Sequence, residues 1–440
     1  MKHNFSFFKY LIVLLFAGVV TGCSQDDEFL IDPPNIAQGE QQLQDTLTMG
    51  EELLLSPKFS NTKNSTFEWT VDGEIVGNDS TYVFIPETRG THEISVQAMN
   101  DGGEAALTYN IHSWGAFENG FYLINEGWFG HGTGTVGFYR YDTQQLEDSV
   151  YVKTNPNKDF LPMNSTLEFG TVYNEKLYLL SKVGGPVVVA NAYSLKEEQR
   201  IASQAGNDWR AFLGISATKG LLSSSDGIHN INLETLQIEG KIPGISGQVG
   251  DMEKVGDYIF VLSQREGAVI FNATSYEIEK RIPGMVLGFA KTADNNIWVA
   301  GDKKLIKINP NNLETEEIEL SFSAYGSWGA WHPSSITASD KAVFIAKNSS
   351  FSGGKEIYKY EDDVASLEKA FIQLPENEVF YGKGLAYNPD TKQLIIRTVR
   401  EGWGENFSYN KLHFYNTTSG NLDKTESYEG YYFPAAPVFH

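Results

Sequence analysis

One segment of the chain matches a phosphate-binding pattern letter for letter. Gly132, Gly134 and Gly137 have the spacing GxGxxG, in which a glycine-rich turn at the start of a helix holds a dinucleotide pyrophosphate. That chemistry requires a helix directly after the glycines. The residues that follow here, 138–141 (FYRY), have the composition of a strand instead. We therefore expect no nucleotide site.

Other catalytic patterns are sparse. His131 and His332 could meet on one face of a folded domain, but no histidines have the HxxxH or HExxH spacing of metal sites, so structural or solvated histidines are favoured. The sequence contains no GxSxG nucleophile elbow. Carboxylates brought together from distant segments could still perform glycosidic chemistry, although no local pattern indicates them. We predict a protein that is not an enzyme and that has neither a metal nor a catalytic cofactor.

The single cysteine, Cys23, offers a different chemistry. Residues 20–23 (VTGC) resemble a bacterial lipobox, in which the cysteine thiol accepts a diacylglycerol. They follow a basic start and an apolar run, 10–20, that is too short to span a bilayer. We expect a lipoprotein signal peptide over 1–22 and a membrane anchor of acyl chains at Cys23. A buried free thiol is the alternative.

The segment after this cysteine is acidic. Residues 24–28 (SQDDE) resemble the export signal of Bacteroidota lipoproteins, which implies an outer-membrane lipoprotein exposed at the cell surface. A disordered acidic spacer is the alternative, and 23–38 is expected to be a flexible tether in either case. The whole chain has 34 Lys and Arg against 56 Asp and Glu, a formal net charge of −22. Such a chain repels phosphate backbones, so no nucleic-acid partner is expected.

Residues 39–112 have the pattern of a small β-sandwich. Runs of alternating apolar and polar residues are separated by turn residues, and Asp72-Gly73 is typical of a tight hairpin turn. Trp69 lies in such a run and is expected in the core. The succession of FEW at 67–69, a late strand and NDG at 100–102 resembles a PKD-type immunoglobulin-like module. Its simplest role is that of a spacer.

A hydrophobic strand core recurs seven times in the remaining segment, 113–440. The copies are spaced by 56, 44, 38, 38, 46 and 51 residues, and they begin at Phe121, Leu177, Leu221, Ile259, Ile297, Val343 and Leu394. A period of about 40 residues with strands and turns but no helices is typical of a β-propeller. We predict an all-β chain, a seven-bladed β-propeller preceded by a small Ig-like (PKD-type) β-sandwich.

The two ends of the predicted propeller complement each other. The first repeat, at 120–125, matches the second strand of a blade, so the first blade lacks its inner strand. A segment at 431–439 is left over after the seventh blade. We predict that this C-terminal strand supplies the missing inner strand and closes the ring, which removes an exposed edge.

Long loops rich in aromatic residues fall on one face of the predicted propeller. Loops between the second and third strands of a blade, and loops between blades, open on the same face. Flat rings supply contact area while amides and charges orient a ligand, so this face is expected to bind a small molecule. For each ring, packing against its own blade is the alternative. The residues expected to contact the ligand are Trp128, Phe129, Asn157, Phe160, Trp209, Arg210, Arg265, Trp328, Tyr381, Arg400 and Trp403.

Both ends of this segment resemble a known family. Residues 120–127 (GFYLINEG) with the glycine-rich loop after them, and 430–439 (GYYFPAAPVF), are similar to the opening and closing strands of Bacteroidota surface propellers of the YVTN-like or DUF5074 type. That group includes the BtuG-type cobalamin-binding lipoproteins. The resemblance implies that the chain captures cobalamin or another corrinoid as a transported ligand. It also implies delivery to a TonB-dependent outer-membrane transporter.

Two alternatives stay open, because a fold does not determine a ligand. The resemblance to the cobalamin-binding members does not extend to the N-terminal module, which makes a divergent ligand possible. One alternative is a propeller that binds a glycan or another nutrient for a different transporter. The other is a propeller enzyme, such as a lyase or a lactonase, with its chemistry in the channel mouth.

Overall fold

The computed structural model describes residues 31–37, 44–326, 336–349 and 353–440. Two compact units divide the chain, one of residues 1–46, 52–85 and 91–112, and one of residues 47–51, 86–90 and 113–440. Cys23, Trp328 and His332 lie outside the described residues, so the predictions about them stay predictions. In the part of the chain that is described, no helix is long and apolar enough to cross a membrane.

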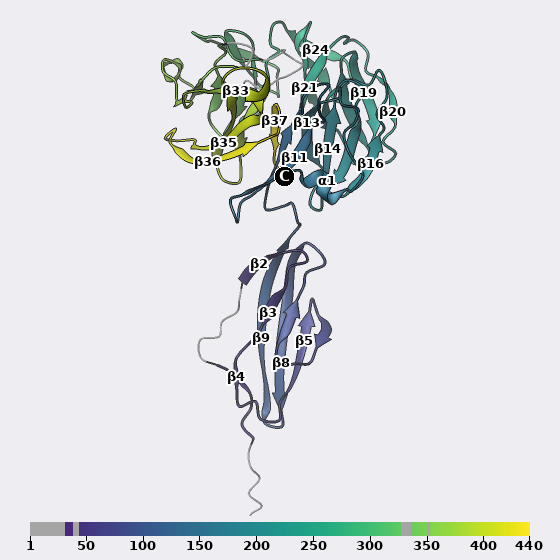
Figure 1. Cartoon of the computed structure of the whole chain (residues 1–440), viewed down its shortest axis with the longest axis vertical. Coiled ribbons are helices and arrows are strands. Elements are labelled where there is room, and N and C mark those ends of the chain that lie inside the picture. Colours follow the sequence, from purple (N-terminus) through teal and green to yellow (C-terminus); the bar gives the residue numbers. More distant parts are fainter. Residues whose placement is uncertain (1–30, 38–43, 327–335, 350–352) are drawn as a thin grey trace, which may run out of the picture. The chain divides into compact units, whose positions relative to one another are not determined.

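The first unit is a β-sandwich (Figure 1), and Trp69 lies in its core. Trp69 is fully buried and stacks on Tyr109 with a centroid distance of 6.3 Å, which confirms its predicted place in the core. Asp72 and Gly73 have φ values of 51° and 86°, as a two-residue hairpin turn requires. One sheet has the order β2-β9-β8-β5-β6, and two smaller sheets pair β1 with β4 and β3 with β7. Its strands are β1 (Asn35–Ile36), β2 (Gln44–Thr48), β3 (Leu53–Leu55), β4 (Phe59–Ser60), β5 (Thr66–Val71), β6 (Glu74–Gly77), β7 (Tyr82–Phe84), β8 (Gly90–Asn100) and β9 (Gly103–Trp114).

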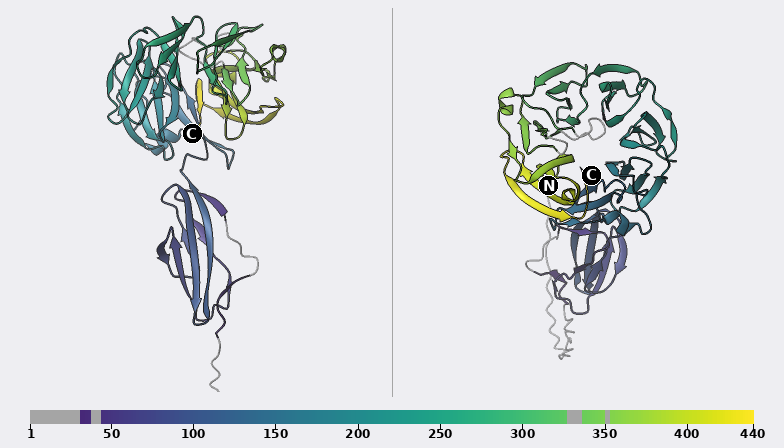
Figure 2. Two further views of the ribbon diagram at one scale, coloured as in Figure 1. Left: turned by 180° about the vertical axis from the view of Figure 1, so that it is seen from behind. Right: turned by 45° about the horizontal axis from the view of Figure 1, so that its top comes forward.

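The second unit is a ring of seven four-stranded sheets, which confirms the predicted propeller (Figure 2). Blade 1 combines β37 (Pro434–Val438) with β10 (Gly120–Asn125), β11 (Thr135–Arg140) and β12 (Leu146–Glu147). Blades 2 to 4 comprise β13 (Leu167–Tyr173), β14 (Lys176–Ser181), β15 (Val187–Asn191), β16 (Glu197–Ile201); β17 (Trp209–Gly214), β18 (Lys219–Ser224), β19 (Gly227–Asn232), β20 (Ile238–Lys241); and β21 (Val249–Val255), β22 (Tyr258–Ser263), β23 (Gly267–Asn272), β24 (Ile278–Ile282).

Blades 5 to 7 follow the same order from the channel outward. They comprise β25 (Phe289–Lys291), β26 (Ile297–Ala300), β27 (Lys304–Ile308), β28 (Thr315–Glu319); β29 (Ile336–Ala338), β30 (Val343–Ala346), β31 (Glu356–Tyr360), β32 (Ile372–Gln373); and β33 (Glu378–Asn388), β34 (Gln393–Arg400), β35 (Tyr409–Asn416), β36 (Leu422–Glu429). Short helices interrupt the loops at α1 (Val150–Thr154), η2 (Val364–Leu367) and η3 (Gly404–Ser408).

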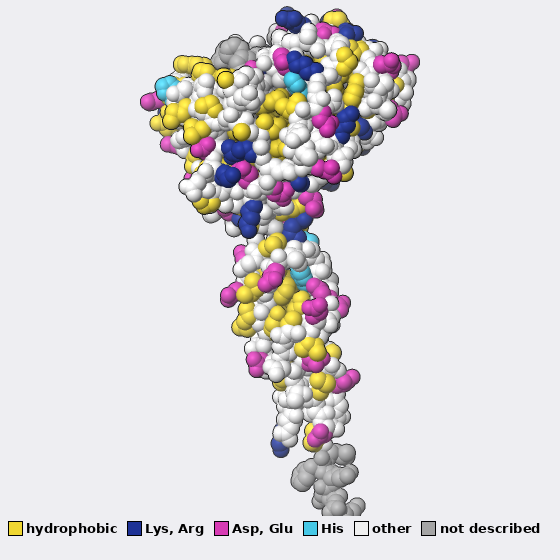
Figure 3. Space-filling view, turned by 90° about the vertical axis from the view of Figure 1, so that its right-hand side faces the viewer, with side chains coloured by type: hydrophobic (Ala, Val, Ile, Leu, Met, Phe, Trp, Pro, Cys, Tyr) yellow, Lys and Arg dark blue, Asp and Glu magenta, His cyan; other side chains and the backbone are white. Residues whose placement is uncertain are grey.

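The seven repeated hydrophobic cores are the second strands of the blades. These strands are buried, which explains why each is a run of apolar residues that recurs in the sequence. Every residue of β10 is buried, and so are residues 259–263 of β22, because each blade packs between two neighbours and hides both faces. Outer strands behave differently, and all four residues of β20 are exposed. On the side of the propeller seen in Figure 3, acidic and basic side chains are interspersed, as on an ordinary solvated surface.

The C-terminal strand closes the ring as predicted. β37 pairs antiparallel with β10, with Tyr122 opposite Val438 and Ile124 opposite Ala436. Blade 1 therefore takes its inner strand from one end of the unit and its other strands from the opposite end. The segment predicted to follow the GxGxxG match as a strand is also confirmed, since Thr135–Arg140 forms β11.

Candidate functional site

Four loops converge at the end of the propeller where the inner strands begin. We call this end the aromatic face and define it by residues 126–134, 155–166, 401–408 and 430–433. Backbone hydrogen bonds hold the loops together, from Glu126 N to Phe433 O at 2.7 Å and from Gly130 N to Met163 O at 2.9 Å. Loops that hydrogen-bond to one another present their side chains from a common, rigid platform.

An aromatic cluster lies beneath this face, where blade 7 meets blade 1. Phe433 is at its centre, with φ of 56°, and stacks on Phe407 at a centroid distance of 4.9 Å. Trp403 and Tyr381 contact the same ring at 6.1 and 5.6 Å. Trp128, which is half-buried, packs on Tyr432 at 4.8 Å. The cluster brings together three of the predicted ligand residues, Trp128, Tyr381 and Trp403.

Two rings on the loops of this face are exposed to solvent. Phe129 is 55% exposed and Trp403 62% exposed, and they are the only exposed aromatic side chains among the described residues. Leu161 and Met163, on the adjoining loop, are exposed as well. Large apolar side chains that remain exposed to water on rigid loops are typical of a binding surface.

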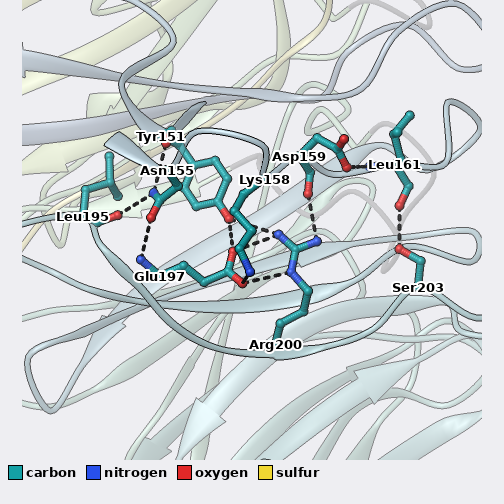
Figure 4. Close-up of polar contacts among 9 residues, drawn as sticks. All are labelled: Tyr151, Asn155, Lys158, Asp159, Leu161, Leu195, Glu197, Arg200 and Ser203. Atoms are coloured by element: carbon teal, nitrogen blue, oxygen red, sulfur yellow. Dashed lines mark hydrogen bonds and ion pairs between the residues drawn. The ribbon is translucent and has the colours of Figure 1, made fainter. Parts of the chain in front are cut away.

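The loop that leads to blade 2 is pinned by a polar network (Figure 4). Glu197 at the start of β16 accepts hydrogen bonds from Tyr151, from Lys158 Nζ at 3.2 Å and from Arg200 Nη2 at 2.8 Å. Burial alone would raise the pKa of Glu197, but these partners outweigh it and lower the pKa. Arg200 also donates to the carbonyl oxygen of Asp159 at 2.9 Å. The network fixes 151–161 against blade 2.

The two predicted ligand residues of this loop, Asn157 and Phe160, differ in their exposure to solvent. Phe160 is 1% exposed and packs on Tyr151 at a centroid distance of 4.7 Å, so it serves the interface between blades 1 and 2 rather than a ligand. Asn157 is exposed, with φ of 68°, and its amide is accessible from solvent. The expectation that Phe160 contacts a ligand is corrected, because its ring is covered.

Trp209 and Arg210 also differ from expectation. Trp209 is 4% exposed and belongs to the core between blades 2 and 3, beside Phe212. Arg210 is equally buried and pairs with Asp208, with Nη1 and Oδ1 2.5 Å apart. The ion pair outweighs burial and lowers the pKa of Asp208. Both side chains fix the start of inner strand β17, and neither is accessible to a ligand in this structure.

The remaining predicted residues are divided between surface and interior. Arg265 and Arg400 are exposed, and the Arg400 guanidinium carbon lies 3.4 Å from the ring centroid of Tyr409. Tyr381 is buried within the aromatic cluster, and burial together with the nearby Glu126 carboxylate raises the pKa of its hydroxyl. It therefore supports the exposed rings and is not itself a contact surface.

A buried ionic cluster lies where the second strands of blades 1 and 2 meet the aromatic face. Lys182 Nζ is 2.5 Å from Glu168 Oε2 and 3.3 Å from Glu126 Oε2, and the three side chains are less than 10% exposed. Burial alone would lower the pKa of Lys182, but the two carboxylates raise it. A lysine held in its charged form between two acids fixes the end of β10, the strand that leads into the loop of Phe129.

Sequence reasoning missed Tyr432 and Phe433. Both were assigned to the closing strand, whereas β37 begins only at Pro434 and the two rings belong to the aromatic face. The available signal was the triplet Tyr431-Tyr432-Phe433 directly before a proline. Proline biases the preceding residue away from helical backbone, and aromatic residues at the end of a strand are candidates for a binding face.

A concavity of about 520 Å³ lies beside blade 7 and is lined by Glu378, Arg400, Tyr409 and Lys411 among others. Glu378 is its most constrained group, with Thr398 Oγ1 and His413 Nε2 each 2.7 Å from its Oε2. Burial by itself would raise the pKa of Glu378, but these hydrogen bonds and that from Lys411 lower it to about 2.

Acid is expected to weaken the fold through this carboxylate. The pKa of Glu378 is lower in the folded chain than its ordinary value of 4.5, so its contribution is present above about pH 4.5 and is lost as the pH falls toward 2. The difference in unfolding free energy between the natural chain and Glu378→Gln, measured in urea from pH 6 to pH 3, should shrink as the pH falls. Glu429→Gln, an exposed change in the same groove, is the control. A difference for Glu378→Gln that is independent of pH would contradict the assignment.

These features define a class of protein, a seven-bladed β-propeller with an aromatic loop face that follows a PKD-like module. The chain belongs to the family described as "Domain of unknown function (DUF5074)", whose model matches residues 119–440. A PKD-like domain model matches residues 33–100. The family-level resemblance predicted from the two ends of the propeller is thereby confirmed.

Similarity to other proteins is confined to the fold. No curated protein matches the chain. Among solved structures, a quinoprotein alcohol dehydrogenase-like protein of Bacteroides thetaiotaomicron is 18% identical with a TM-score of 0.56, over 92% of this chain and 99% of that one. PorZ of Porphyromonas gingivalis, a surface component of the type-IX secretion system, is 12% identical with a TM-score of 0.40, over 80% of this chain and 46% of that one.

Proposed function

We propose that this chain is a cell-surface lipoprotein whose propeller captures a small nutrient on the aromatic face. It delivers the nutrient to a TonB-dependent outer-membrane transporter, and a corrinoid such as cobalamin is the ligand favoured. The observation that carries the proposal is the exposed ring of Trp403 on a packed aromatic cluster, together with a second exposed ring, Phe129, on a neighbouring loop of the same face. Rings that stay exposed on a rigid support are pre-organised for binding, because little conformational freedom is lost when the ligand arrives.

The chemistry of a corrinoid suits this surface. Its broad macrocycle can cover Phe129 and Trp403, and its amide side arms need donors and acceptors around that centre. Asn157, Arg265 and Arg400 are exposed and carry such groups. A glycan could bind to the same rings. Competition between cyanocobalamin and a glycan for the chain shows which of the two ligand classes binds more tightly.

Two substitutions test the binding surface. Trp403→Ala and Phe129→Ala should each weaken binding of cyanocobalamin by ~1–3 kcal/mol, because each ring is solvent-exposed before binding and would be covered after it. Calorimetric titration of the full chain measures the affinity. Leu422→Ala, which removes an exposed apolar side chain on outer strand β36, is the matched control and should bind as the natural chain does.

The result that contradicts the proposal is equally specific. Natural affinity in both ring variants would mean that the aromatic face is not the binding surface. The delivery step is tested separately, by asking whether an outer-membrane transporter copurifies with the chain from its native membrane and whether cyanocobalamin changes the amount recovered.

A further inference from the structure

A cavity of about 710 Å³ occupies the central channel at the opposite end of the inner strands from the aromatic face. Its walls come from the C-terminal parts of the inner strands, including Thr171 and Tyr173 of β13, Asp251 and Glu253 of β21, and Tyr387 of β33. The volume lies within the range of about 300–1,000 Å³ that is typical of small-molecule sites. None of its lining residues belongs to the aromatic face or was singled out from the sequence.

The charge of this cavity differs from that of the chain as a whole. Its lining contains three lysines and two carboxylates, namely Lys254, Lys291, Lys383, Asp251 and Glu253, in a chain with 34 basic and 56 acidic residues. Asp251 and Glu253 both line the cavity from inner strand β21. Burial in the channel raises the pKa of Glu253 despite the opposing effect of Lys291. The lining thus has more basic than acidic side chains, unlike the chain as a whole.

Lys383 reaches the channel because its strand bulges. The pairing of β33 with β34 shifts register between Phe380 and Leu385. Gly382 has φ of 61°, and a Cβ on Gly384 would lie 2.9 Å from the carbonyl oxygen of Arg397, so the bulge requires glycine on both sides of the lysine.

The two lysines nearest the carboxylates remain accessible. Lys383 Nζ is 3.1 Å from Asp251 Oδ2, which links blade 7 to blade 4, and its side chain is 39% exposed. Lys291 Nζ is 3.4 Å from Glu253 Oε1, and its side chain is 44% exposed. Each ammonium can therefore turn from its partner toward an anion in the cavity, since such partly solvated pairs contribute little to stability.

The rest of the lining suits a hydroxylated ring. The aromatic side chains of Phe169, Tyr173, Phe289, Tyr387 and Phe439 line the cavity and offer flat apolar surface. Each inner strand is the last strand of its sheet, so its second edge carries peptide N–H and C=O groups that no strand within that sheet pairs. Hydroxyl groups of a ligand could bond to those edges.

We propose that the channel cavity is a second ligand site, which takes a small hydroxylated ring compound bearing one carboxylate, of the uronic-acid class. Lys383 and Lys291 supply the cationic partners for the carboxylate. The site is independent of the aromatic face and does not depend on the function proposed for it.

Calorimetric titration of the full chain with D-glucuronate, against D-glucose as the neutral probe of matched size, tests this site. We expect saturable binding of D-glucuronate and at least tenfold weaker binding of D-glucose. Lys383→Met should weaken D-glucuronate binding at least tenfold. Lys304→Met, an exposed lysine on β27 that pairs with Glu317, should leave it unchanged.

The direction in which Asp251→Asn changes the affinity for D-glucuronate is the most decisive test. Removing this carboxylate frees Lys383 from its partner, so binding of D-glucuronate should become stronger, which a damaged fold could not produce. This variant also decides the matter if Lys383→Met fails to fold. The proposal is overturned if D-glucuronate does not bind, if D-glucose binds equally well, or if Asp251→Asn weakens binding.

Discussion

A chain that ends at Phe433 is expected to lose the cooperative thermal transition of the propeller. Removing β37 leaves blade 1 with three strands and exposes the edge of β10, where Tyr122, Leu123 and Ile124 pair with the lost strand. It also uncovers buried surface on both sides, because Ala435, Ala436 and Val438 are at most 4% exposed. An open ring has no barrier to separation of its terminal blades.

Differential scanning calorimetry of the truncated and natural chains measures this effect. A synthetic peptide of residues 434–440 should restore the transition by adding the missing strand, and a scrambled peptide of the same composition should not. A truncated chain with the natural melting temperature and enthalpy would show that the C-terminal strand is not the closure of the ring.

Arg397→Met is expected to destabilise the propeller by about 3–5 kcal/mol. Arg397 is fully buried between blades 7 and 1, and its guanidinium donates to Ile124 O at 2.6 Å, to Asn125 Oδ1 at 2.5 Å and to Tyr428 Oη at 2.8 Å. Methionine has comparable length but donates no hydrogen bond, so these buried acceptors lose their partner. Burial lowers the pKa of Arg397, although its contact with Tyr428 opposes that shift.

Urea unfolding of the variant measures the loss. Arg265→Met makes the same change at an exposed arginine and should alter the unfolding free energy by no more than ~0.5 kcal/mol. Equal effects of the two substitutions would mean that Arg397 does not join the blades. Arg397 and β37 both lie at the junction between blades 7 and 1. The variant and the truncation together therefore test how far the stability of the ring depends on this junction.

The architecture could be predicted because its determinants are local in sequence. Each second strand is covered on both faces, so it must be a short apolar run such as 259–263, and seven such runs set the number of blades. The closing strand could be predicted because the first blade lacks an inner strand in the sequence, while the segment at 431–439 belongs to no other blade. The turn at Asp72 and Gly73 follows from the local preference of the Asp-Gly pair for positive φ at both residues.

The site could be predicted only in part, because exposure depends on contacts between distant residues. Phe129 and Phe160 are both loop phenylalanines, yet one is 55% and the other 1% exposed. The difference arises from the network around Glu197, whose hydrogen bond with Tyr151 joins residues 46 positions apart. The channel cavity could not be predicted for a similar reason, because its residues Lys383 and Asp251 are 132 positions apart in the sequence.

Hydrogen–deuterium exchange of the full chain with saturating cyanocobalamin locates the surface that the ligand covers. We expect slower exchange in residues 126–134, 401–408 and 430–433, the loops that carry Phe129 and Trp403 and their aromatic neighbours. The inner-strand ends around Asp251 and Tyr387 should exchange as in the free chain. Slower exchange at those strand ends instead, or at no segment of the chain, would contradict the assignment of the aromatic face as the ligand-binding surface.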